Sequence, residues 1–313
     1  MKPCILAATL ALFLLAGCER YDYETKASRT IDFSANIASG QTFLVSAPGN
    51  HIDVNVTHGS GPGCKGKLTI KATANSRKAA EKSLKDTQVT FKETSTGVNV
   101  NVVAAARHMP LVFDVTLPKG AGVELRSETG NVTGNHVDGP FKAVSQTGMV
   151  SAEDVSGPIS LQSDTGAVGV TYPDDAPRSP KITATSKSGD VHCDDIAGDV
   201  SVESQSGDID VTYWKNAPAS PAVKIHTESG DIDFTPPGAL DAHVDVSTGS
   251  GRISGSLAVS PAPGASAKTI QVTVGSGKGS VTLQTGSGDI DIHEAEGSGD
   301  EESSAPLDSS TAI

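Results

Sequence analysis

The chain has few aromatic residues, few cysteines and little positive charge. Aromatic residues make up 4 % of the sequence, which argues against a protein that stacks sugars or nucleic-acid bases on its side chains. The formal net charge is −13, and this disfavours nucleic acid and anionic lipid headgroups as partners. Cys64 and Cys193 are the two cysteines beyond the N-terminal segment. Because two cysteines so far apart give no disulfide framework, we expect two buried thiols, and a disulfide between them, which an exported compartment permits, is the alternative.

Long apolar runs are scarce as well. The run at the N-terminus, from Ile5 to Ala16, has roughly 12 residues, whereas a helix that spans a membrane needs about 20. It predicts a secretory signal peptide over residues 1–17. The run ends in the sequence Leu-Ala-Gly-Cys18, which resembles the lipobox of bacterial lipoproteins.

The lipobox resemblance implies a site of lipid attachment. It implies cleavage before Cys18, a diacylglyceryl group on its thiol and acylation of the new amino terminus, and several acyl chains give stable anchoring. An ordinary signal peptide with an incidental cysteine is the alternative. Glu19 stands where an aspartate often signals inner-membrane retention, so the outer membrane is favoured, facing the periplasm or the cell surface. We expect a tether at residues 18–30 and a disordered acidic tail at 294–313.

One eight-residue sequence recurs along the chain. Residues 204–211 read SQSGDIDV, and residues 227–234 read TESGDIDF. Several copies lie 18 residues apart and the other gaps are longer, which is typical of a solenoid whose extra residues form loops. Such loops are expected at residues 172–180 and 213–221, which carry prolines. The central glycines of the eight copies are Gly130, Gly148, Gly166, Gly189, Gly207, Gly230, Gly251 and Gly288.

Each repeat predicts two short strands joined at a glycine corner. In SGDIDV, Ile209 and Val211 alternate with aspartates, as in a strand with one buried face. A second strand follows a further glycine, as Ile159 and Leu161 follow Gly157. Strands and corners of this length stack into a parallel β-solenoid. A Greek-key sandwich is the rival fold, but its strands would not need a near-identical repeat.

Residues 31–118 precede the repeats and have a different pattern. They contain alternating strands such as VNVNVV at 98–103, and one helix is expected at residues 75–85, which have a capping residue and no glycine or proline. We expect this β-rich section to cap the N-terminal end of the solenoid, where open strand edges favour aggregation. The prediction is therefore an all-β fold, with solenoid repeats over residues 119–293 and a strand-rich N-terminal cap that contains one short helix.

The polar residues of the repeat are predicted to be structural. Ser204, Ser206 and their equivalents can form hydrogen bonds with neighbouring coils or with the turn backbone. Calcium is the alternative, because stacked carboxylates repel each other and a hard cation with oxygen ligands relieves that repulsion. However, the calcium-binding repeat has nine residues and paired glycines, about half the step found here, so no cofactor is expected. The aspartates in question are Asp190, Asp208, Asp231 and Asp289, with Asp210, Asp233 and Asp291.

The octets, the strand-rich section before them and the sequence FDVTLPKG at 113–120 together resemble a bacterial domain family. It is the adhesin-type domain of unknown function that is rich in Ser-Gly-Asp-Ile repeats, and the resemblance covers roughly residues 40–293. It implies a β-solenoid of the cell envelope, often membrane-anchored, and it brings no catalytic residue. Met149, Ala167 and Arg252 replace the aspartate in three octets, which puts in doubt any role that needs an unbroken row.

Three other chemistries find little support. A polysaccharide hydrolase or lyase is the enzyme hypothesis, but aspartates are so plentiful that some pair always has a suitable separation. The sequence GSGKGS at residues 275–280 resembles a phosphate loop, yet glycine follows Lys278 and the segment lies between strands. The group His192-Cys193-Asp194-Asp195 has metal-ligand residue types, but no second cluster at zinc spacing accompanies it.

The sequence thus predicts a lipid-anchored, non-catalytic protein of the cell envelope that binds, adheres or scaffolds. Its mechanism would be repeated weak contacts along a rigid rod, with an envelope protein or a polysaccharide as ligand. A periplasm-facing accessory in envelope-stress signalling and a polysaccharide-acting enzyme are the alternatives. Cys18 is the one site residue assigned, and no catalytic, cofactor-binding or metal residue is assigned.

Overall fold

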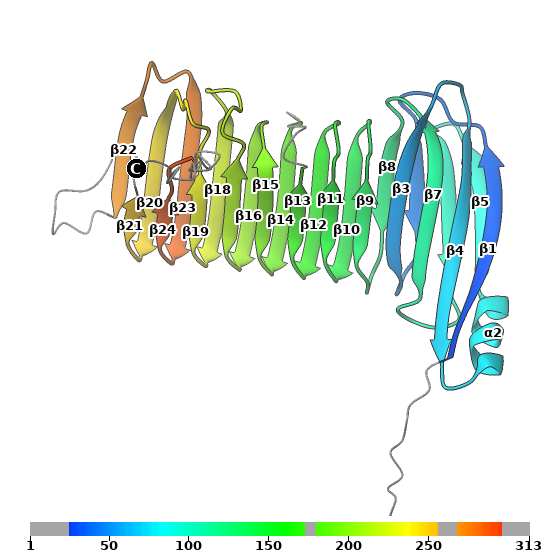
Figure 1. Cartoon of the computed structure of the whole chain (residues 1–313). Coiled ribbons are helices and arrows are strands. Elements are labelled where there is room, and N and C mark those ends of the chain that lie inside the picture. The colour runs from blue at the N-terminus through cyan, green and yellow to red at the C-terminus, as the bar shows by residue number, and fades with distance from the viewer. Residues whose placement is uncertain (1–24, 173–179, 256–267, 296–313) are drawn as a thin grey trace, which may run out of the picture.

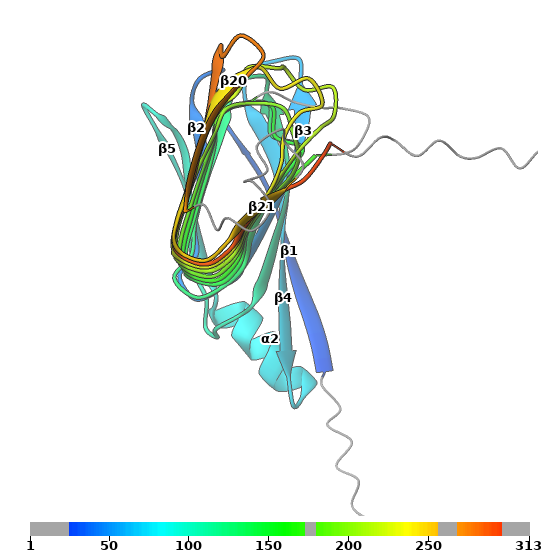
Figure 2. The ribbon, with the colours of Figure 1, turned by 90° about the vertical axis from the view of Figure 1, so that its left-hand side faces the viewer.

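The computed structural model describes residues 25–172, 180–255 and 268–295. These residues form an elongated rod of stacked strands with the single labelled helix at one end (Figure 1). Seen along the rod, the coils superimpose and enclose the core between two walls (Figure 2). The predicted parallel β-solenoid is confirmed. The expected signal peptide, Cys18, residues 173–179 of the first expected loop and residues 296–313 of the expected tail lie outside the described residues.

The two walls are two β-sheets, each of twelve strands within the described part of the chain. Sheet A consists, in spatial order, of β1 (Thr25–Ala35), β4 (Cys64–Ala74), β7 (Pro110–Pro118), β3 (His51–Gly59), β9 (Val132–Asn135), β11 (Val150–Glu153), β13 (Val168–Thr171), β15 (Val191–Ile196), β17 (Ile209–Tyr213), β19 (Ile232–Thr235), β24 (Ile290–Ile292) and β21 (Ile253–Gly255). Sheet B consists of β22 (Thr269–Val274), β20 (Ala242–Ser250), β23 (Gly279–Ser287), β18 (Ala222–Ser229), β16 (Val200–Ser206), β14 (Ile182–Ser188), β12 (Ile159–Thr165), β10 (Phe141–Thr147), β8 (Gly122–Arg126), β2 (Thr42–Ser46), β6 (Gly97–Val103) and β5 (Gln88–Thr94).

Each complete solenoid coil gives one strand to each sheet, and the strands pair in parallel register. Ile159 in β12 pairs with Ile182 in β14, which pairs with Val200 in β16. These residues and their neighbours two positions along are buried, whereas the residues between them face outward. Because neighbouring strands lie about 4.8 Å apart, each inward position forms a continuous apolar column along the rod. This arrangement is a direct result of the alternation in the sequence.

The coils follow chain order except at the C-terminal end. In sheet A the strand β24 lies between β19 and β21, and in sheet B the strand β23 lies between β18 and β20. The octet centred on Gly288 therefore stacks directly on the octet centred on Gly230, and the Gly251 octet lies outside it. The antiparallel strand β22 then pairs with β20 and forms the last edge of sheet B.

The N-terminal strands extend both sheets and close that end of the rod. We call residues 25–118 the cap and residues 119–295 the solenoid. Antiparallel pairs β1–β4, β4–β7 and β5–β6 form the outer part of the cap. The predicted helix is present as α2 (Arg77–Asp86), with Ser76 as its N-cap. Ala80 and Leu84 are buried, and the Arg29 guanidinium donates to the carbonyls of Leu84 and Thr87, each at 3.2 Å, at the C-terminal end of α2.

Strand β1 begins earlier than the sequence suggested. Residues 25–30, which we expected to belong to the tether, pair with β4 from Thr25 opposite Ala74 onward. The segment TKASRT has no apolar alternation, so its backbone pairing with β4 leaves no sequence signal. Cys64 in the cap and Cys193 in the solenoid are both free and buried, as predicted. Among the described residues, no helix has the length and apolar content needed to cross a membrane.

Candidate functional site

The first residue of each octet is a buried hydroxyl that ties one coil to the next. The Ser145 hydroxyl donates to the Gly130 carbonyl at 2.9 Å, and the Ser163 hydroxyl donates to the Gly148 carbonyl at 3.0 Å. Ser186, Thr227, Thr248 and Thr285 make the equivalent bond to the glycine of a neighbouring coil. Ser204 is an exception, because its buried hydroxyl has no partner among the described residues. These side chains are structural and cannot reach a ligand.

The aspartate after the central glycine is also a structural residue. Asp208 Oδ1 accepts a hydrogen bond from the Asp231 amide at 2.9 Å, and Asp231 Oδ1 accepts one from the Asp289 amide at 2.7 Å. The ladder continues from Asp289 to the Arg252 amide at 2.8 Å. Each carboxylate therefore links successive coils at the corner. Backbone donors already offset part of its charge, which weakens the case for a bound cation at this row.

The outer face of sheet B is polar and balanced in charge. Neighbouring strands are joined by ion pairs across the face: Lys142 with Glu124 at 3.5 Å, Lys187 with Asp164 at 2.8 Å and Lys224 with Glu203 at 3.2 Å. Between the charges lie hydroxyl and amide side chains that repeat in register from strand to strand. The positions beside the corner form one exposed row of hydroxyls, made by Thr147, Thr165, Ser188, Ser206, Ser229, Ser287 and Ser250.

A shallow groove of about 540 Å³ crosses this face over β16, β18 and β23. Its walls offer both hydrogen-bond donors and acceptors, including Ser201, Lys224, Thr282 and Gln284. The side chains come from strands that are far apart in the sequence but adjacent in the sheet. The sequence did not indicate this groove, because nothing in the octets shows that β23 packs beside β18.

The outer face of sheet A is acidic. Its solenoid strands contain no Lys or Arg, and Asp210, Asp233 and Asp291 follow each other in register. His293 Nε2 lies 3.1 Å from Asp233 Oδ1. No three His, Cys, Asp or Glu side chains of the described residues converge closely enough to hold a metal ion. The calcium alternative is thus left without a ligand set in this part of the chain.

The group at residues 192–195 does not act as a unit. Cys193 points into the core and burial raises the pKa of its thiol to about 12, whereas His192 is exposed on the outer side of β15. Burial, and then the charge of Asp210, raises the pKa of Asp194, and His192 lowers it in part. Because successive residues of a strand face opposite ways, Cys193 cannot join His192 and Asp194 at one metal ion.

The GSGKGS segment lies between β22 and β23 and holds a carboxylate of its own chain. The Ser276 and Gly277 amides donate to Asp241 Oδ1 at 2.6 and 2.7 Å. The Ser276 hydroxyl bond, together with these amides, lowers the pKa of Asp241. The amides that a phosphate would use are therefore already occupied, and this segment is a structural turn.

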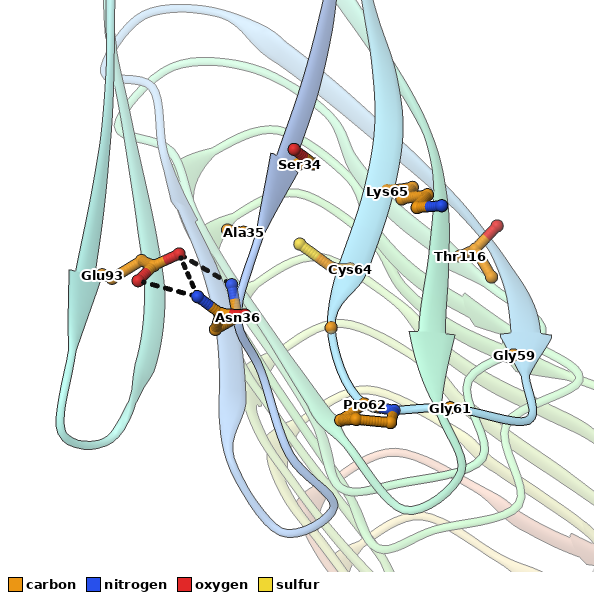
Figure 3. A pocket seen from close by; sticks show the side chains of 11 residues that line it. Ser34, Ala35, Asn36, Gly59, Gly61, Pro62, Cys64, Lys65, Glu93 and Thr116 are labelled. Atoms are coloured by element: carbon orange, nitrogen blue, oxygen red, sulfur yellow. Dashed lines mark hydrogen bonds between the residues drawn. The ribbon is translucent and has the colours of Figure 1, made fainter.

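A second cavity, of about 440 Å³, lies in the cap between the end of β1, the turn before β4 and strand β5 (Figure 3). Cys64 lines it, but burial raises the pKa of its thiol, which disfavours the nucleophilic thiolate. The Glu93 carboxylate accepts hydrogen bonds from the Asn36 amide at 2.7 Å and from its side chain. The one carboxylate in this cavity is thus held in place as a strand-to-strand contact.

Comparison with known proteins gives one family and several distant solved structures, including the following two. The Toastrack DUF4097 family model matches residues 49–293. No curated protein matches the chain. A crystal structure of a candidate cell adhesion protein from Clostridium sporogenes is 10 % identical with a TM-score of 0.27, and covers 85 % of this chain and 100 % of that one. A candidate adhesin from Parabacteroides merdae is 10 % identical with a TM-score of 0.26, covering 86 % and 97 %.

Proposed function

The chain belongs to the Toastrack DUF4097 family, and we propose that it is a non-catalytic, lipid-anchored rod of the bacterial envelope that binds through sheet B. The observation that carries the proposal is the groove over β16, β18 and β23, whose lining includes the hydrogen-bonding side chains of Ser201, Lys224, Thr282 and Gln284. Its ligand would be a polar envelope polymer, either protein or polysaccharide. With few aromatic residues to stack on sugars, binding would depend on hydrogen bonds.

The rigid register of the coils supports binding by many weak contacts. Each coil presents the same outward positions one strand spacing further along the rod, so a ligand with repeating groups can engage several coils at once. Linking weak contacts in this way raises the overall affinity well beyond that of any one contact. The ion pairs between neighbouring strands fix the side chains of this face, and the buried hydroxyl bonds fix its backbone.

The groove is tested by filling it. The double variant Ser201→Arg, Thr282→Arg places two long side chains over the groove, and Thr212→Arg, Thr235→Arg places the same side chains on the outer face of sheet A. All four positions are half-buried outward positions. We expect the groove variant to bind isolated cell envelopes at least about tenfold more weakly in a sedimentation assay, with the sheet A variant unchanged. Equal binding by the two variants would refute the proposal.

The anchor and the side it faces need separate measurements. Mass spectrometry of the membrane-associated protein should find a diacylated Cys18, and Cys18→Ala should release the protein from the membrane fraction or leave it unprocessed. Protease treatment of intact cells should digest the rod if its role is adhesion. Protection until the envelope is opened would refute adhesion and leave a periplasm-facing scaffold or signalling accessory.

A further inference from the structure

The charges of this acidic protein are separated along the rod. The cap, residues 25–118, contains 11 Lys and Arg and 6 Asp and Glu, a formal charge of +5. The solenoid, residues 119–295, contains 11 Lys and Arg and 23 Asp and Glu, a formal charge of −12. The net charge of −13 therefore describes neither part. One end of the rod is basic although the whole chain is acidic.

The positive charge at this end includes an exposed stripe on α2. Lys78, Lys82 and Lys85 are exposed and are spaced at i, i+4 and i+7, so they share one face of the helix. At about 100° per residue, this face points away from Ala80 and Leu84, which pack against the cap. No carboxylate of the described residues forms an ion pair with the three lysines, which we call the lysine stripe.

The other charges of α2 reduce its field only in part. Arg77 and Glu81 form an i,i+4 ion pair at 2.8 Å, so they largely offset each other. Asp86 lies at the last position of the helix and is exposed. The helix therefore keeps a net positive charge, and that charge is concentrated on the side that faces solvent.

The chain enters the structure beside this helix. Thr25, the first described residue, pairs with Ala74, two residues before the N-cap Ser76. Figures 1 and 2 show α2 and the beginning of β1 together at one extremity, away from the solenoid coils. Thr25 is the seventh residue after Cys18, and seven residue steps span at most about 25 Å. A lipid on Cys18 would hold Thr25, and with it this end of the cap where α2 lies, close to the membrane surface.

We propose that the lysine stripe docks on anionic phospholipid headgroups, while the acidic solenoid is repelled and points away from the membrane. The proposal rests on the proposed anchor at Cys18, which brings the helix close to the surface. The net charge of the whole sequence disfavours such lipids as partners, but the negative charge that does so lies on the solenoid and not on the cap. The lipid anchor gives attachment, and the lysine stripe gives the rod its orientation.

The test measures vesicle binding without the acyl chains. The mature chain from residue 18 onward, carrying Cys18→Ala, is floated with vesicles of phosphatidylcholine and phosphatidylglycerol, and with phosphatidylcholine alone. We expect binding to the anionic vesicles only, weakening as salt shortens the screening length. Lys78→Gln, Lys82→Gln and Lys85→Gln together should weaken binding roughly 100-fold, since each lysine near an anionic surface contributes a factor of about 5.

The matched control removes the same number of positive charges from the solenoid. Lys142→Gln, Lys187→Gln and Lys215→Gln remove three exposed lysines from the solenoid, and this variant should bind the vesicles as the parent does. Equal weakening in both triple variants, or equal binding to neutral vesicles, would overturn the proposal. Circular dichroism confirms that both variants fold. Because the protein in this assay carries no acyl chain, the result does not depend on whether Cys18 is acylated in cells. It is also independent of whether the groove on sheet B binds a ligand.

Discussion

Replacing Gly207 by alanine should destabilise the solenoid at a corner between two coils. Gly207 has φ +157°, and an added Cβ would lie 2.6 Å from the carbonyl carbon of Gly189 in the preceding coil and closer still to its oxygen. Cβ contacts below 3.0 Å essentially do not occur, so the backbone of one coil must move. The strained backbone costs about 1–3 kcal/mol and the overpacking about 1–3 kcal/mol more, which makes about 2–6 kcal/mol in total.

Gly40→Ala is the matched control, because it separates backbone strain from the clash. Gly40 has φ +79°, and an added Cβ there meets no atom within 4 Å, so we expect a cost of about 1–2 kcal/mol. Thermal and urea unfolding followed by far-UV circular dichroism would measure both variants, at roughly 2–4 °C of Tm per kcal/mol for a chain of this size. If Gly207→Ala is no less stable than Gly40→Ala, the inference that the corners stack too closely to admit a Cβ atom is refuted.

Two further predictions concern polar groups. Asp208→Ala removes the acceptor of the Asp231 amide and should lower the free energy of unfolding by about 1 kcal/mol. Asp210→Ala relieves repulsion on sheet A and should be neutral or slightly stabilising. If urea unfolds the Asp210 variant at a lower concentration than the Asp208 variant, the structural role of Asp208 is contradicted. Burial and the neighbouring His108 lower the pKa of His51, whose Nδ1 accepts from the Asn131 amide. Stability from this neutral histidine is complete above its ordinary pKa of 6.5 and is lost as pH falls towards the lower folded-state value. In His51→Asn, the unfolding midpoint should therefore fall less steeply as the pH is lowered just below 6.5. An unchanged dependence of the midpoint on pH would disprove the contribution of His51.

Much of the fold could be predicted because its signals are local. The alternation of apolar and polar residues in Val98–Val103 and in the octets indicated strands with one buried face, and a capping residue without glycine or proline nearby indicated α2. The structural role of the first hydroxyl of the octet followed from its position beside a turn, although the Ser204 hydroxyl has no partner among the described residues and Ser206 is exposed. Each of these inferences needs only the conformational preferences of neighbouring residues.

The groove on sheet B could not be predicted in this way. It depends on β23 lying beside β18, and the octets centred on Gly230, Gly251 and Gly288 are too alike to specify which stacks on which. The early start of β1 was missed for a related reason, since residues 25–30 pair through their backbone and bury little apolar surface.

By itself, the sequence determined the length of the coil, the two strands in it and the inward residues, because these depend only on a repeat of 18 residues and its alternation. Only the tertiary structure decided the order of the last coils, the site of the groove and the basic end beside α2. Those features depend on which segments meet in space, and the cost of closing a loop grows too slowly with its length to impose chain order on similar coils.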